Sequence, residues 1–221
     1  IEELGTLETP IALTNTMNIG KVHDALVEYM ARQAEAHGVR LRSVNPIVGE
    51  CNDSALNEIT ERVIEKEHVF AAIESAGVDF ALGDVGAGKG TTCFGLKGGI
   101  GSASRVFEVG KETYTLGVLV QSNFGEMENL RLDGKPIGRE LAQKLASSEQ
   151  DKGSIMIVAA TDMPVTSRQL QRIIKRAGVG LARLGSFWGH GSGDIVIGFS
   201  TAQRICSEES SGTIALRALN E

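Results

Sequence analysis

The chain has 221 residues, of which 42% are hydrophobic and 23% charged, and its formal net charge is -6. This length is enough to bury a substantial core, and an acidic balance without a basic patch argues against a nucleic-acid partner. No apolar run approaches the roughly 20 residues that a membrane helix needs, so we expect no membrane partner.

The cysteine content predicts neither disulfides nor a metal site. The three cysteines, Cys51, Cys93 and Cys206, are odd in number, lie far apart and lack metal-type spacing. No signal peptide is visible at the first residue. We therefore expect reduced thiols in a cytoplasmic protein.

The first third of the chain predicts short strands and helices. Residues 10–14 are typical of a strand, and apolar spacing from Val22 onward predicts a helix that ends at Gly38. Residues 39–48 alternate enough to predict another strand. A helix capped by Asp53 or Ser54 is expected through about Ile64, and a shorter one around residues 69–75.

The middle of the chain is rich in glycine and in β-branched residues. We expect strands at residues 106–109 and 113–120, a turn at Asp133-Gly134 and a short helix over residues 138–146. The stretch Gly83 to Gly90, GDVGAGKG, is superficially like a phosphate-binding loop. A glycine follows its lysine where that motif needs Ser or Thr, so a structural turn or a set of oxyanion-facing amides is the better interpretation.

A polar loop over residues 147–152 leads into Gly153, Ser154 and a wholly apolar run. The run is short and rich in β-branched residues, which predicts a buried strand that begins at Ser154. A serine can simply begin a strand. Alternatively, the Ser154 hydroxyl attacks the Gly153 carbonyl and frees its own α-amine, whose reference pKa of about 7.7–8.0 suits a base. Glycine suits this position because it tolerates a strained backbone.

The last part predicts a helix capped by Thr166 or Ser167 and an apolar strand over residues 194–201. Strands and helices are mixed without strict alternation. This favours α+β layering, with sheets packed face to face and helices outside.

Five stretches, in chain order, resemble the L-aminopeptidase/D-amidase-esterase family, the DmpA-like and β-peptidyl aminopeptidases: ETPIALTNT, GAGKGTTCFGLKGGIGSASR, YTLGVLVQSNFG, GSIMIVAATDMP and GHGSGDIVIGFST. The resemblance implies a four-layer α-β-β-α sandwich similar to N-terminal-nucleophile hydrolases. Members of the family are longer at both ends, so it also implies that this sequence lacks segments at both ends.

The resemblance also implies a self-cleaving serine aminopeptidase or amidase. Cleavage between Gly153 and Ser154 would leave residues 1–153 as one subunit and residues 154–221 as the start of the other, within one structural domain. Small peptides, amino-acid amides or esters would be the substrates, and no cofactor or metal would be needed. A homo-oligomer, a tetramer of cleaved pairs, is the expected assembly.

Five further residues take roles from the resemblance. Ser192 would hydrogen-bond the Ser154 hydroxyl, and Asp194 would orient Ser192 or the α-amine, since residues two apart on an extended segment face the same way. Asn123 would donate to the oxyanion, and Glu50 would bind the ammonium group of the substrate. Asn52 stands where relatives carry an oxyanion-assisting tyrosine, and its reach is shorter. His190 is interpreted as a loop residue.

Two other functions stay open at this stage. Ornithine acetyltransferases are similar in fold and self-processing, but they use a threonine nucleophile where this chain has Ser154. A non-catalytic small-molecule binding or assembly protein of the same fold would show neither cleavage nor hydrolysis.

Overall fold

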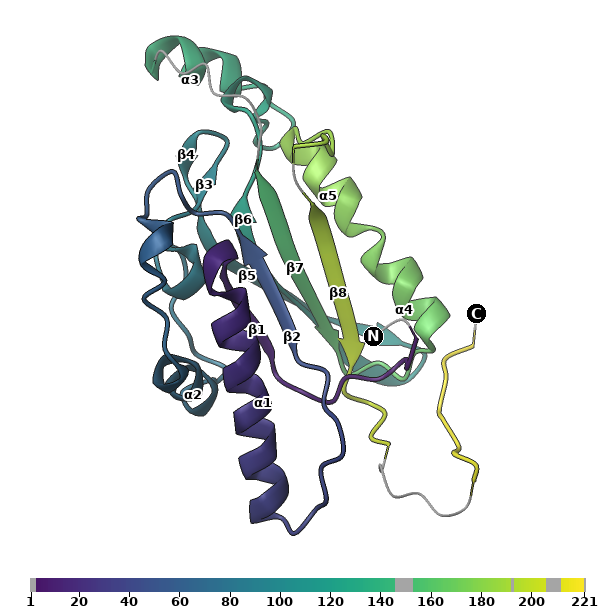
Figure 1. Ribbon diagram of the computed structural model, residues 1–221. Coiled ribbons are helices and arrows are strands. Elements are labelled where there is room, and N and C mark those ends of the chain that lie inside the picture. Colours follow the sequence, from purple (N-terminus) through teal and green to yellow (C-terminus); the bar gives the residue numbers. More distant parts are fainter. Residues whose placement is uncertain (1–2, 146–152, 192, 206–211, 221) are drawn as a thin grey trace.

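Figure 1 shows the computed structural model of the chain, which describes residues 3–145, 153–191, 193–205 and 212–220. Its elements are, in chain order, β1 (Ile11–Asn15), α1 (Ile19–Ala36), β2 (Ile47–Cys51), α2 (Lys66–Glu74), β3 (Thr92–Cys93), β4 (Leu96–Lys97), β5 (Gly99–Val109), β6 (Glu112–Asn123), α3 (Gly138–Leu145), β7 (Ser154–Thr161), α4 (Ser167–Ile174), α5 (Ala177–Leu184) and β8 (Asp194–Ser200). Within the described residues no helix is both long enough and apolar enough to cross a bilayer.

The strands form two principal sheets and one small hairpin. β1 and β2 pair in parallel, so Asn15 lies opposite Cys51 at their carboxyl ends. The larger sheet has the order β5-β6-β7-β8, antiparallel from β5 to β7 and parallel between β7 and β8. β3 and β4 form the hairpin.

The two sheets pack face to face, and helices cover both outer faces (Figure 1). β2 contacts β6 and β7, while α1 and α2 pack on the far side of β1 and β2. α4 and α5 cover the far side of the larger sheet. This helix-sheet-sheet-helix order confirms the expected α+β sandwich.

A glycine lets the two sheets approach closely. A Cβ atom added at Gly49 on β2 would lie 2.6 Å from Cε of Met156 on β7 and 2.8 Å from Cδ2 of Leu13 on β1. Side chains alternate along a strand, so Met156 and Ser154 face the β1–β2 sheet together. Ile155 and Ile157 face α5, where they form a cluster with Phe124 and Leu181.

Most expected elements are confirmed, including the helix that ends at Gly38, whose φ of 66° is left-handed. Thr166 caps α4 by accepting from the Gln169 backbone N–H at 3.2 Å. The Asp133-Gly134 turn is also present, with left-handed φ values of 50° and 78°.

Two expected elements are wrong. The helix expected from Asp53 to Ile64 is replaced by turns and one 3-10 turn at Ile59–Glu61, because the Asp53 side chain bonds Asn15 rather than capping. The strand expected over residues 39–48 begins only at Ile47. Before it, Asn45 donates its backbone N–H to Glu8 instead of to a neighbouring strand.

Candidate active site

Ser154 is the first residue of β7 and is only 4% exposed. Its antiparallel partner is Asn123, the last residue of β6. Both residues have the strand parity that faces the β1–β2 sheet, because Gln121 and Met156 on the same strands contact that sheet. The sheet register therefore places the serine and the asparagine side by side at one end of the sandwich.

Gly153 must be a glycine for want of space. A Cβ atom there would lie 1.9 Å from the backbone oxygen of Asn123 and 2.7 Å from the Cα atom of Phe124. The φ angle of Gly153 is not left-handed. The need for glycine here therefore comes from lack of space and not from the strained backbone that the sequence led us to expect. The segment before Ser154 is thus pressed against the end of β6.

The Asn123 side chain is clamped on both sides. Its Oδ1 atom accepts from the backbone N–H of Thr92 at 3.0 Å, and its Nδ2 atom donates to the backbone oxygen of Asn52 at 2.9 Å. An amide nitrogen carries two hydrogens, so one donor remains once Asn52 has taken the other. The orientation of the buried amide is fixed before any ligand arrives.

The carboxyl end of β2 meets this pair through consecutive residues. The Cys51 thiol lies 3.6 Å from the backbone oxygen of Ser154 and is fully buried. Burial, together with the negative charges of Glu50 and Asp194, raises the pKa of Cys51 to about 11. The end of β2 therefore packs against the backbone at the start of β7.

Glu50 is half-buried, and its Oε2 atom accepts from the Thr16 hydroxyl. The Asn52 side chain is exposed, and its Oδ1 atom accepts from the Ser54 backbone N–H at 3.0 Å. Asn52 therefore touches the site through its backbone oxygen, which holds Asn123. The contacts of Asn52 therefore differ from those expected, in which its side-chain amide would donate to the oxyanion at Ser154.

Of the two site residues expected near the start of the last strand, the structure describes Asp194. Asp194 begins β8 beside Ile155, and partners in a parallel pair share a face, so its register is that of Ile155 and not of Ser154. Ser192 lies outside the described residues. His190 is exposed in the loop before β8.

The glycine-rich stretch 83–90 is a crossing of backbones. It forms a 3-10 turn at Gly86–Gly88 with no helix after it, and Gly83 bridges to Ile100 of β5. The Ala87 oxygen accepts from Gln121 Nε2 at 3.0 Å. These contacts favour a structural turn at residues 83–90 over a phosphate-binding loop.

Sequence reasoning missed Thr16 and Thr92. Thr16 follows β1, and the carboxyl ends of parallel strands meet at one edge, so its nearness to Glu50 could have been inferred. Thr92 acts through its backbone N–H, for which no side-chain signal exists. The described residues hold no cluster of three His, Cys, Asp or Glu suited to a metal.

Comparison with known proteins gives consistent matches. The model of peptidase family S58 matches residues 1–221. The β-peptidyl aminopeptidase BapA of Sphingosinicella microcystinivorans is 41% identical over 217 residues, which are 91% of this chain and 54% of the relative.

Solved structures agree with this match. The PH0078 protein from Pyrococcus horikoshii OT3 has a TM-score of 0.88 and 49% identity, covering 99% of this chain and 60% of its own. The L-aminopeptidase D-Ala-esterase/amidase from Ochrobactrum anthropi, described as a variant of the Ntn hydrolase fold, has a TM-score of 0.85 and 36% identity. That match covers 95% of this chain and 58% of the other. The chain therefore spans little more than half the length of these relatives.

Proposed function

The chain belongs to peptidase family S58, and from this premise we propose that it is the self-processing part of a serine aminopeptidase or amidase whose nucleophile is Ser154. The observation that best supports this proposal is that Ser154 pairs with Asn123, whose side chain is clamped, at the end of the sandwich. Its relatives named as aminopeptidases or amidases support a substrate with a free amino group.

Self-cleavage would occur between Gly153 and Ser154. The Ser154 oxygen attacks the Gly153 carbonyl carbon, and the C–N bond breaks as the nitrogen takes a proton. Water then hydrolyses the ester, which leaves a carboxylate on Gly153 and an amine on Ser154. Residues 1–153 and 154–221 stay together in one domain because β7 of the second piece pairs with β6 of the first.

The same residues then act on a substrate. The α-amine of Ser154 accepts the hydroxyl proton, the oxygen attacks the amide or ester carbonyl, and the leaving amine or alcohol takes the proton. Water clears the acyl-enzyme. Asn123 holds one fixed N–H toward the oxyanion, a contribution worth about 2.7–4 kcal/mol of barrier in comparable sites.

Glu50 supplies the selectivity for a free amino group. Thr16 holds its Oε2 atom, which leaves Oε1 for the substrate ammonium. Ser192 and Asp194 assist the proton transfer, and the negative charge of Asp194 favours the protonated α-amine. Asn52 takes part through the backbone oxygen that orients Asn123, and we expect an oligomer of cleaved pairs.

The nucleophile is tested with Ser154→Ala and a matched control, Ser104→Ala, at an exposed serine of β5. Intact mass under denaturing conditions should show two pieces in the control and one uncut chain in Ser154→Ala. Ser154→Ala, which stays uncut, should also lose hydrolysis of amino-acid p-nitroanilides. Equal cutting in both variants would contradict the role of this hydroxyl.

The role of Glu50 is tested with Glu50→Gln, which keeps shape but removes charge. We expect KM for an amino-acyl p-nitroanilide to rise while self-cleavage continues, because the cleavage involves no ammonium group. Light scattering of the purified protein checks the oligomer. An unchanged KM would exclude Glu50 as the ammonium partner.

A further inference from the structure

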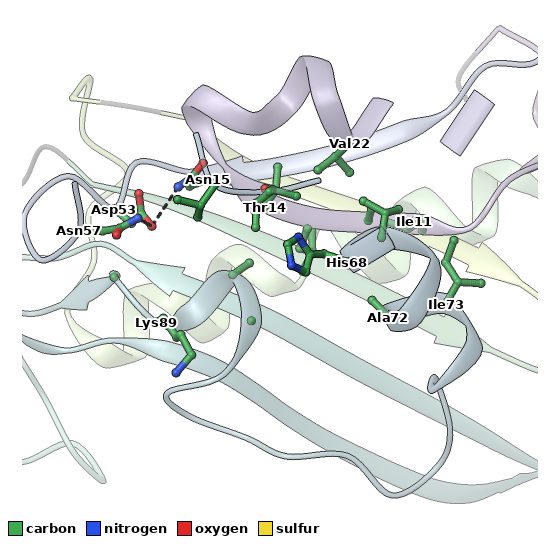
Figure 2. A pocket seen from close by; sticks show the side chains of 18 of the residues that line it. Ile11, Thr14, Asn15, Val22, Asp53, Asn57, His68, Ala72, Ile73 and Lys89 are labelled. Carbon is green, nitrogen blue, oxygen red and sulfur yellow. Dashed lines mark hydrogen bonds between the residues drawn. The ribbon is translucent and has the colours of Figure 1, made fainter. Parts of the chain in front are cut away.

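A cavity of about 560 Å³ is lined by residues of β1, α1, α2 and the 86–90 turn (Figure 2). Neither Ser154 nor Asn123 lines it, and Glu50 does not either. Its walls are mostly aliphatic: Ile11, Val22, Val69 and Ile73. The cavity is therefore separate from the site described above.

One end of this cavity carries a buried carboxylate. Asp53 is 5% exposed, and its Oδ2 atom accepts from Asn15 Nδ2 at 3.2 Å and from Asn57 Nδ2 at 2.9 Å. Its Oδ1 atom is enclosed and has no hydrogen-bond partner. Gly90 packs on this carboxylate, because a Cβ atom there would lie 2.9 Å from Oδ2.

No protein cation balances Asp53. Among the residues that the structure describes, no Lys, Arg or His nitrogen lies within 4.0 Å of its carboxylate. Lys89 lines the same cavity, but its side chain points away from Asp53 (Figure 2). Buried carboxylates in proteins are normally paired with a cation or satisfied at both oxygens, and Asp53 is neither.

We propose that this cavity binds a primary ammonium ion that carries an aliphatic chain, with the ammonium on Asp53 and the chain against Ile11, Val22 and Ile73. Contact with Oδ1 requires the carboxyl to turn about its broad χ2 torsion, and the ammonium replaces any bond that Oδ2 gives up in that turn. The ammonium then supplies the missing hydrogen bond and the missing charge together. The aliphatic wall favours a chain of about four to six carbons over a compact cation.

The experiment is calorimetric titration of the whole chain with pentylammonium chloride, compared with 1-pentanol, which keeps the chain but lacks the charge. Pentylammonium should bind this cavity at least about tenfold more tightly than pentanol, as expected for a charge-assisted hydrogen bond. Asp53→Asn should remove that advantage.

A second pair of variants tests the cavity even if the Asp53→Asn variant fails to fold. Ala72 and Ala71 are neighbours on α2 and both are exposed, but only Ala72 lines the cavity. Ala72→Phe should abolish binding, and Ala71→Phe should leave it unchanged. Equal binding of pentanol and pentylammonium, unchanged binding by Ala72→Phe, or no binding at millimolar concentration would each overturn the proposal.

Discussion

The two faces of β6 and β7 differ in polarity, although their residues alternate along the same strands. On the inner face Gln121, Asn123 and Ser154 are buried and polar, and both amide side chains are hydrogen-bonded to neighbouring backbone. On the outer face Ile155 and Ile157 belong to an apolar cluster under α5. The proposed chemistry and the packing are thus separated by single-residue parity, so each can be perturbed alone.

The sharpest separation is expected at Asn123. Asn123→Ala should lower kcat per folded molecule by about 100- to 1,000-fold, because a fixed oxyanion donor is lost. Asn129→Ala removes an asparagine whose amide bonds Glu126 outside the site, and it should leave kcat unchanged. Steady-state hydrolysis of an amino-acyl p-nitroanilide measures both, and equal rates for the two variants would break the comparison.

Substitutions on the outer face should change the free energy of unfolding instead of kcat. Ile157→Ala removes a side chain that is 4% exposed and should lower the free energy of unfolding by about 2–5 kcal/mol. Ile195→Ala on β8, where the side chain is 50% exposed, should cost far less. Urea unfolding gives these values, and kcat per folded molecule should stay constant in both variants.

Gln121 lies on the inner face yet should act on stability. Its Nε2 atom donates to the backbone oxygens of Thr14 and Ala87, both at 3.0 Å. Gln121→Leu strands these two carbonyls and should cost about 1–3 kcal/mol of unfolding free energy. The exposed Gln171→Leu is the control, and a similar loss in both would show that the two bonds contribute nothing specific.

The smallest effect is expected from Cys51 and appears only in alkali. Burial raises its pKa from 9.0 to about 11, so between these values the unfolded thiol loses its proton while the folded thiol keeps it. Stability should therefore fall as pH rises through this window, because the unfolded chain binds fewer protons. Cys51→Ser lacks this titration, so its urea midpoint should fall less steeply, and parallel curves would exclude the effect.

Local pattern accounts for much of the fold. The apolar run after Ser154 predicts a strand buried on both faces, and that is β7. Helical spacing with a glycine stop predicts α1, and a capping residue predicts the start of α4. The expectation fails at residues 53–64, where helical spacing is present but the Asp53 side chain is taken by Asn15 and Asn57.

By itself, the sequence determined the buried strand that begins at Ser154, the helix that stops at Gly38 and the family likeness, because these are carried by short stretches of neighbouring residues. Only the tertiary structure decided that Asn123 faces Ser154, that Thr92 and Asn52 clamp its amide, and that Oδ1 of Asp53 lacks a hydrogen-bond partner beside a second cavity. These depend on strand register and on how closely two sheets approach. Contacts between distant segments set both, and no local pattern encodes them.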